Sequence, residues 1–155
     1  QYVEPDIKVA VSYAGTFVDS TKGKELALSQ MNQQKVDICY QIASQTGIGV
    51  LDAAKELGLY AIGVDGDQAA PFKDSDPAMA EVIVTSMMKR VDQSLLRAVK
   101  MAEEGTLTWG QTEVVGLKEL GVGIVYGENF ERELSAENQQ LVKWIPQTLQ
   151  SSATK

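Results

Sequence analysis

Residues 36–68, VDICYQIASQTGIGVLDAAKELGLYAIGVDGDQ, decide the fold class. The stretches 36–43 and 59–64 are predicted to be strands, and the segment between them carries apolar residues at helical spacing. Gly58 follows that segment, as glycine commonly does where a helix ends. A strand, a helix and a second strand in this order predict parallel pairing with a right-handed crossover. The nearly unbroken apolar character of residues 59–64 predicts a sheet that is covered on both faces.

The alternation of strands and helices continues on both sides of this unit. Apolar side chains at every second position of residues 7–11 predict a strand, and Asp19 or Ser20 can cap the helix that follows. Residues 66–80 are predicted to form a long loop and residues 81–85 a short strand. The sequence therefore predicts an α/β protein in which helices flank a parallel sheet. In such sheets ligands bind beyond the carboxyl ends of the strands.

The C-terminal part is predicted to begin with an amphipathic helix that Ser86 caps. Its apolar positions at helical spacing are Met88, Val91, Leu95, Val99 and Ala102. Two short strands are predicted at residues 113–117 and 122–126, before a last helix that Ser135 caps. That last helix is expected to turn Leu141, Trp144 and Ile145 inward.

The composition narrows the possible functions. The chain has 155 residues, of which 44% are hydrophobic and 23% charged, as in an ordinary globular domain. A net charge of −7 argues against nucleic acid and against an anionic membrane surface as partners. Histidine is absent, which removes histidine-dependent catalysis and histidine-ligated metals, and the single Cys39 excludes an internal disulfide. No apolar run reaches the ~18 residues that a membrane-spanning helix needs.

Aromatic residues follow the first predicted strand. Tyr13 and Phe17 lie in the stretch YAGTF. An aromatic side chain on a strand-end loop can stack on a flat ligand such as a nucleobase. Alternatively, Tyr13 or Phe17 only closes the edge of the domain.

A glycine turn follows the second predicted strand. In residues 44–49, SQTGIG, Gly47 and Gly49 lie at a helix start, where backbone amides can approach an anion or a hydroxyl group. The same residues can equally form no more than a tight turn. They do not complete a dinucleotide-binding motif, because its third glycine would fall on Asp52.

Carboxylates follow the third predicted strand. Asp65 comes directly after the buried stretch, and Asp67 lies two positions further on. A carboxylate on so rigid a support can accept hydrogen bonds from vicinal hydroxyls, which suits a sugar. Alternatively, Asp65 caps a loop and Asp67 is solvated. A magnesium ion is the weaker interpretation, because no phosphate-binding loop accompanies the two carboxylates.

Lys89 follows the fourth predicted strand and falls in the first turn of the helix that Ser86 is expected to start. A lysine there opposes the helix dipole, so partners elsewhere would have to hold it. The simpler alternative is an exposed lysine without a role.

Several segments together resemble one family. They are PDIKV, YAGTFVDSTKGKELA, VDICYQIASQTGIGVLDAAKE, YAIGVDGDQ, VTSMMKRVD and VGLKELGVGI. In this order they look like successive blocks of the basic membrane protein (BMP) family. Its members are bacterial substrate-binding lipoproteins of ABC transporters, and characterised members bind purine nucleosides. The resemblance covers residues 3–126 and is looser beyond them.

The resemblance implies a type I periplasmic-binding fold, in which two α/β lobes close on a ligand. It also implies that Phe17 would stack on the base, that Asp65 would bind ribose hydroxyls, and that Lys89 would join Asp65 there. Ser44 stands where the family usually has glycine, which leaves a close backbone contact at that turn open. The loop after Asp65 is longer than is usual in the family, so Asp67 competes for the same role.

Family members are much longer than this chain, so the resemblance implies the C-terminal half of such a protein. Residues 1–86 would form later strands of the C-terminal lobe, residues 87–150 segments that return to the first lobe, and residues 151–155 a frayed tail. The signal peptide and the lipid-anchored cysteine would precede Gln1, and Cys39 would not be that cysteine. Without its other lobe the chain is expected to self-associate.

The expected function is that of a binding protein for a bacterial ABC importer. Its ligand would be a purine nucleoside or a similar small molecule, its protein partner a permease, and its place the extracytoplasmic face of the cell membrane. No cofactor, metal or catalysis is expected. The alternative is a ligand-sensing regulatory domain of the same fold. A third reading, an enzyme that uses Asp65, Asp67 and Lys89, lacks a histidine, a nucleophile motif and a cofactor loop.

Overall fold

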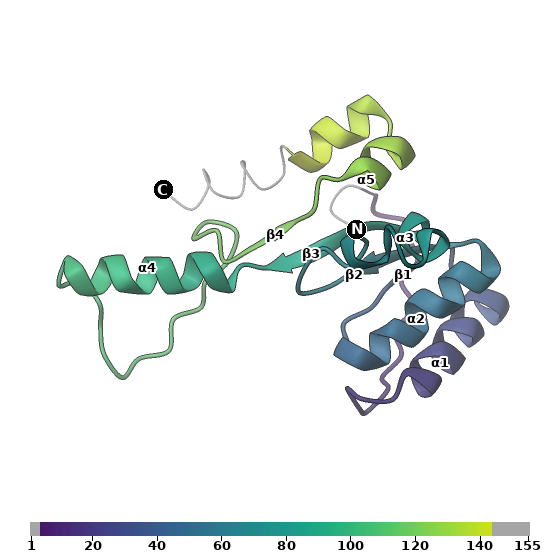
Figure 1. Cartoon of the computed structure of the whole chain (residues 1–155), viewed down its shortest axis with the longest axis horizontal. Coiled ribbons are helices and arrows are strands. Elements are labelled where there is room, and N and C mark those ends of the chain that lie inside the picture. The colour runs from purple at the N-terminus through teal and green to yellow at the C-terminus, as the bar shows by residue number, and fades with distance from the viewer. Residues whose placement is uncertain (1–3, 144–155) are drawn as a thin grey trace.

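The computed structural model describes residues 4–143, and its centre is a four-stranded sheet (Figure 1). The strand order follows the sequence: β1 (Ile38–Tyr40), β2 (Tyr60–Gly63), β3 (Ile83–Lys89) and β4 (Val122–Ile124). The first three strands pair in parallel, and β4 pairs antiparallel to β3. A mostly parallel sheet flanked by helices confirms the predicted fold class.

Helices cover the two sides of the sheet unequally. The helices α1 (Ser20–Gln33) and α2 (Ser44–Leu57) lie on one side, and α5 (Glu128–Glu133) lies on the other (Figure 1). The 3-10 turn η1 (Ala70–Phe72) and the helix α3 (Pro77–Val82) join β2 to β3. As predicted, α1 is capped by Asp19, whose carboxylate accepts a hydrogen bond from the amide of Lys22, and α2 ends at Gly58 in the left-handed conformation.

Small residues bring α1 and α2 together. Gly23 lies against the backbone carbonyl of Thr46, and Gly49 lies against that of Ser20, so a side chain at either glycine would collide with backbone. The core lies between these helices and the sheet. Its buried residues are Ala27, Met31, Cys39, Leu51, Ala53, Ala54, Ala61, Ala69, Met79 and Ile83.

The helix α4 (Val91–Glu103) is the exception to this packing. None of its residues is buried, and it extends away from the sheet beyond the end of β3 (Figure 1). Its exposed apolar residues are Val91, Leu95, Leu96 and Val99. In residues 4–143 no helix is both long enough and apolar enough to cross a membrane.

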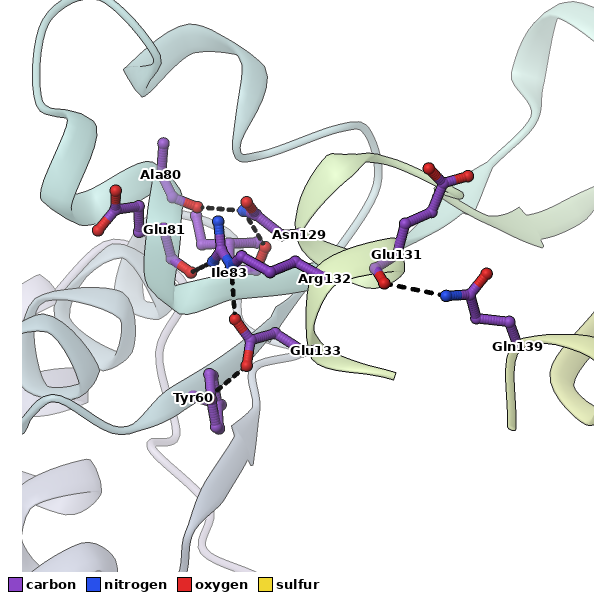
Figure 2. A network of polar contacts seen from close by, with 9 residues as sticks. All are labelled: Tyr60, Ala80, Glu81, Ile83, Asn129, Glu131, Arg132, Glu133 and Gln139. Atoms are coloured by element: carbon purple, nitrogen blue, oxygen red, sulfur yellow. Dashed lines mark hydrogen bonds and ion pairs between the residues drawn. The ribbon is translucent and has the colours of Figure 1, made fainter. Parts of the chain in front are cut away.

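Polar contacts fasten α5 to the sheet (Figure 2). The amide of Asn129 donates to the carbonyls of Ala80 (2.6 Å) and Ile83 (2.9 Å), at the junction of α3 and β3. The hydroxyl of Tyr60, the first residue of β2, donates to the carboxylate of Glu133 at 2.5 Å. The segment after β4 therefore returns to the same sheet that residues 38–89 build.

The structure corrects two predictions in the first half of the chain. Residues 7–11 form no strand, and within residues 4–143 β1 hydrogen-bonds as a strand only with β2. Their alternation cannot build a strand alone, because a strand needs a neighbour to satisfy its amides and carbonyls. The predicted loop at 66–80 holds η1 and the start of α3, which Asp76 caps by accepting a hydrogen bond from the amide of Met79.

Two further predictions fail in the second half. The fourth strand extends to Lys89, and Ser86 is a buried strand residue instead of a helix cap, because the amide of Gln68 donates to its hydroxyl at 3.2 Å. Lys89 therefore ends a strand and does not lie in a helix turn. No strand forms at residues 113–117.

The last helix begins after Ser135, as predicted, and the amide of Asn138 donates to the Ser135 hydroxyl. Trp144, Ile145 and the tail at 151–155 lie outside the described residues.

Candidate functional site

Asp65 and Lys89 meet at the carboxyl ends of β2 and β3. The Lys89 ammonium lies 2.9 Å from the Asp65 carboxylate, and the Lys89 amide donates to the Asp65 carbonyl at 3.0 Å. Both side chains stay about half exposed, at 50% for Asp65 and 60% for Lys89. Because both groups are exposed, their polar atoms remain accessible to hydrogen bonds from a ligand. A solvent-exposed ion pair of this kind adds little to stability.

Asp67 is engaged in its own loop. Its carboxylate accepts hydrogen bonds from the amides of Ala69 (3.1 Å) and Ala70 (3.3 Å), which is the local turn that aspartate side chains commonly form. Of the two carboxylates predicted as alternative sugar ligands, Asp65 is the one that pairs with Lys89.

A buried amide network lies beneath these strand ends. Gln41 is 3% exposed and donates from Nε2 to Oε1 of Gln68 at 2.5 Å. The same Gln68 oxygen accepts from the Val64 amide, and the Gln68 amide donates to the buried Ser86 hydroxyl. These bonds tie together the ends of β1, β2 and β3 and satisfy polar groups that would be costly to bury unpaired.

Phe17 and Tyr13 lie on the loop before α1, and both are exposed, at 66% and 89%. The carbonyl of Phe17 accepts a hydrogen bond from the amide of Thr46 in α2, at 3.2 Å. The two predicted strand-end loops, 12–17 and 44–49, are thus joined to each other. Because both rings are exposed, neither is buried at the edge of the domain.

The turn into α2 contains a residue with a left-handed backbone, Ser44, and a tightly packed glycine, Gly47. Ser44 has a φ of +52°, a conformation that glycine adopts without steric cost. Gly47 is buried and packs against the side chain of Gln41, leaving no room for a Cβ. Asp65 also has a positive φ, +70°, so both strand ends carry backbone strain.

Tyr40, at the end of β1, lies within electrostatic reach of Asp65. Burial, and after it the negative charge of Asp65, raises the pKa of the Tyr40 hydroxyl. Among the residues that the structure describes, no group of three or more His, Cys, Asp or Glu side chains is placed to hold a metal ion.

Sequence reasoning did not find Gln41, Gln68, Thr46 or Tyr40. A signal was present for two of them: Gln41 is the one polar amide within the otherwise apolar or aromatic stretch 38–43, and Thr46 directly precedes Gly47. Gln68 and Tyr40 carry no comparable signal, because their roles depend on pairing between strands.

The fold, with its polar strand ends, is shared with a class of proteins, the substrate-binding proteins. The family model described as "ABC transporter substrate-binding protein PnrA-like" matches residues 1–154. The chain belongs to this family. It is a family of binding proteins and not of enzymes, which confirms the prediction that the chain does no catalysis.

Curated relatives agree with this assignment. The chain is 39% identical over 138 residues to basic membrane protein D of Borreliella burgdorferi (strain JD1), a match that covers 87% of this chain and 38% of that protein. It is 31% identical over 132 residues to "ABC transporter nucleoside-binding protein BmpA" of Lactococcus lactis, covering 79% of this chain and 37% of that protein. The chain spans less than half the length of these relatives.

Solved structures share the fold. A solute-binding protein of an ABC transporter system from Aeropyrum pernix K1 matches with a TM-score of 0.69 and 29% identity, over 93% of this chain and 46% of that chain. A structure from Bacillus halodurans, described as a transcriptional activator of the comK gene, matches with a TM-score of 0.75 and 26% identity, over 93% of this chain and 47% of that one.

Proposed function

We propose that this chain forms the C-terminal half of a two-lobed protein that binds purine nucleosides for an ABC importer. The observation that carries the proposal is the half-exposed Asp65–Lys89 pair at the carboxyl ends of adjacent parallel strands. The printed name of the L. lactis relative, a nucleoside-binding protein, supports the ligand class.

Each predicted site residue has a role in this proposal. Asp65 accepts hydrogen bonds from the ribose hydroxyls, and Lys89 both holds Asp65 and donates to the sugar. Phe17 stacks on the purine. Ser44 and Gly47 shape the turn that faces the ligand, and Asp67 shapes the loop after Asp65 without contacting the ligand.

The division of the chain into lobes is also part of the proposal. The lobe that carries the site extends beyond residue 86 to the end of β3, because it includes Lys89, and α4 reaches toward the other lobe, which fits its lack of buried residues. The predicted boundaries of the segment that returns to the first lobe, residues 87–150, change in this proposal. The helix α5 packs on α3 and β3, so it belongs with the lobe that carries the site. The part assigned to the other lobe is therefore residues 91–121.

The family supports a proposal for the cellular setting. We propose that the whole protein is held by a lipid anchor at the extracytoplasmic face of the membrane and delivers its ligand to a permease. Radiolabelled nucleoside uptake by cells with and without the gene tests this role.

The substitution Asp65→Asn tests the site in the two-lobed protein, because asparagine tolerates the same positive φ and removes only the charge. Loss of a charged acceptor should weaken adenosine binding by ~1.5–3 kcal/mol, which is about ten- to a hundredfold. Titration calorimetry measures the affinity. Asp67→Asn is the matched control and should leave it nearly unchanged; the opposite pattern would move the sugar contact to Asp67.

A sensing role is the second candidate, and the similarity to the B. halodurans structure favours it. In that case deletion of the gene would leave nucleoside uptake intact and change the transcription of other genes when nucleoside is added. Loss of uptake without such a response would support the transport role.

A further inference from the structure

Thr46, in the first turn of α2, is a fully buried residue that lies between the two strand-end loops. It is 1% exposed, and its side chain is enclosed where α1 and α2 approach each other. Its backbone carbonyl lies against Gly23 of α1. Its hydroxyl therefore faces no solvent and must be satisfied within the protein.

The polar groups of Thr46 bind one short segment, residues 16–19. The Thr46 hydroxyl donates to the carbonyl of Thr16 at 3.2 Å and accepts from the amide of Asp19 at 3.0 Å. The Thr46 amide donates to the carbonyl of Phe17 at 3.2 Å. One side chain thus holds both flanks of Phe17, while the Phe17 ring itself stays exposed.

We infer that Thr46 is the positioning residue that fixes the orientation of the Phe17 ring for its ligand, an inference that rests on the proposed stacking role of Phe17. The exposed ring has little packing around it, so the backbone on both sides sets the position of its Cβ and the direction in which the side chain leaves the loop. Asp19 anchors the far end of the loop by capping α1 through the Lys22 amide. Without the Thr46 hydroxyl, the Thr16 carbonyl and the Asp19 amide lose that partner, and of the bonds between Thr46 and this loop only the one from the Thr46 amide to the Phe17 carbonyl remains.

The contrast between Thr46→Val and Thr46→Ser isolates the hydroxyl. Valine keeps the shape of threonine and removes its hydrogen bonds, whereas serine keeps the hydroxyl and removes a methyl group. In the two-lobed protein, Thr46→Val should weaken adenosine binding about tenfold, and Thr46→Ser should stay within about twofold of wild type. Equal losses in both variants would show that packing, and not the hydroxyl, matters.

A double-mutant cycle with Phe17→Leu separates positioning from a general structural effect. If Thr46 acts through the ring, Thr46→Val should cost about tenfold in the wild-type background and less than about twofold when Phe17 is already leucine. Equal costs in the two backgrounds would overturn the inference and place the effect on the α2 turn.

Hydrogen exchange of the 155-residue chain gives a readout that needs no ligand. Thr46→Val should speed exchange of the Asp19 amide at least tenfold, and Thr46→Ser should not. Unchanged exchange in Thr46→Val would also overturn the inference. If exchange responds as expected but Phe17→Leu leaves adenosine affinity unaltered, the stacking role in the proposed function fails, and the inferred positioning for a ligand fails with it.

Discussion

Ser44 and Asp65 both carry a left-handed backbone at the ends of parallel strands. A side chain in this conformation costs about 1–2 kcal/mol relative to the right-handed one. The cost is accepted where the chain must turn sharply from a strand into a helix or a loop.

Replacing Ser44 tests that explanation. Ser44→Gly should raise the free energy of unfolding by up to ~1 kcal/mol, because glycine adopts a positive φ freely and only its greater freedom in the unfolded chain offsets the gain. Ser44→Val should lower it by about 1–2 kcal/mol, since a branched side chain fits this conformation poorly. Urea denaturation measures both. Similar stabilities for the three proteins would mean that Ser44 is not strained.

Phe17 provides a second test at this scale. In the two-lobed protein, Phe17→Tyr or Phe17→Trp should retain most of the adenosine affinity, because each keeps an aromatic face. Phe17→Leu should lose about tenfold, since stacking on a base contributes ~1–3 kcal/mol. Titration calorimetry measures the affinity of each variant. Full affinity in Phe17→Leu would mean that the size of the Phe17 side chain matters and its aromatic face does not. Stability should hardly change, because the ring is exposed.

At the scale of elements, the attachment of α5 depends on the charge of Glu133. The Tyr60 hydroxyl, and after it the Arg132 guanidinium, holds the pKa of the Glu133 carboxyl below its usual value. The same bond raises the pKa of Tyr60. A lowered carboxyl pKa stabilises the folded state above the pKa of the unfolded chain, and the benefit disappears as the pH falls through the folded pKa.

We therefore expect Tyr60→Phe to destabilise the chain at about pH 7 and to have a smaller effect at a pH acid enough to protonate Glu133 in both proteins, because the pKa of Glu133 is lowered in the folded wild type. NMR titration should show a higher Glu133 pKa in Tyr60→Phe than in wild type. Thermal unfolding at the two pH values measures the stability difference. An equal difference at both would mean that the contribution of Tyr60 is packing and does not involve the carboxylate.

The elements show how far sequence reasoning could go. The unit of β1, α2 and β2 was predicted in its type and order, because its hydrophobic pattern and Gly58 are local signals. The extension of β3 to Lys89 was not, because the antiparallel partner that supports it, Val122–Ile124, lies far away in the sequence. For the same reason the sequence placed Asp65 and Lys89 at one edge of the sheet but could not show their ion pair.

At the scale of the whole molecule, the exposed apolar residues of α4 should make this chain self-associate. The exposed fractions of Leu95 and Val99 are 64% and 55%, on a helix without a buried residue. We expect light scattering to show a dimer of the 155-residue chain, and Leu95→Lys combined with Val99→Lys to give a monomer. Lys100→Glu, a charge change at another exposed position of α4, is the matched control.

A stable monomer at high concentration would contradict this expectation.

The same chain should bind adenosine only weakly, because a missing lobe that contributed ~4 kcal/mol would lower the affinity about a thousandfold. Submicromolar binding by the monomer would show that one lobe suffices.

A single residue, Arg90, joins the strand β3 to the projecting helix α4. Lys89 is the last residue of the strand and Val91 the first of the helix, so the ammonium that faces Asp65 and the projecting helix move on one continuous backbone. The Arg90 amide between them donates a hydrogen bond to the carbonyl of Gly121 at 2.9 Å. Gly121 directly precedes β4, so this strand is attached at the same junction. A change in the direction of the helix would therefore be expected to move Lys89 relative to Asp65. Because such coupling is reciprocal, a ligand that binds the ion pair would also favour one direction of the helix over others.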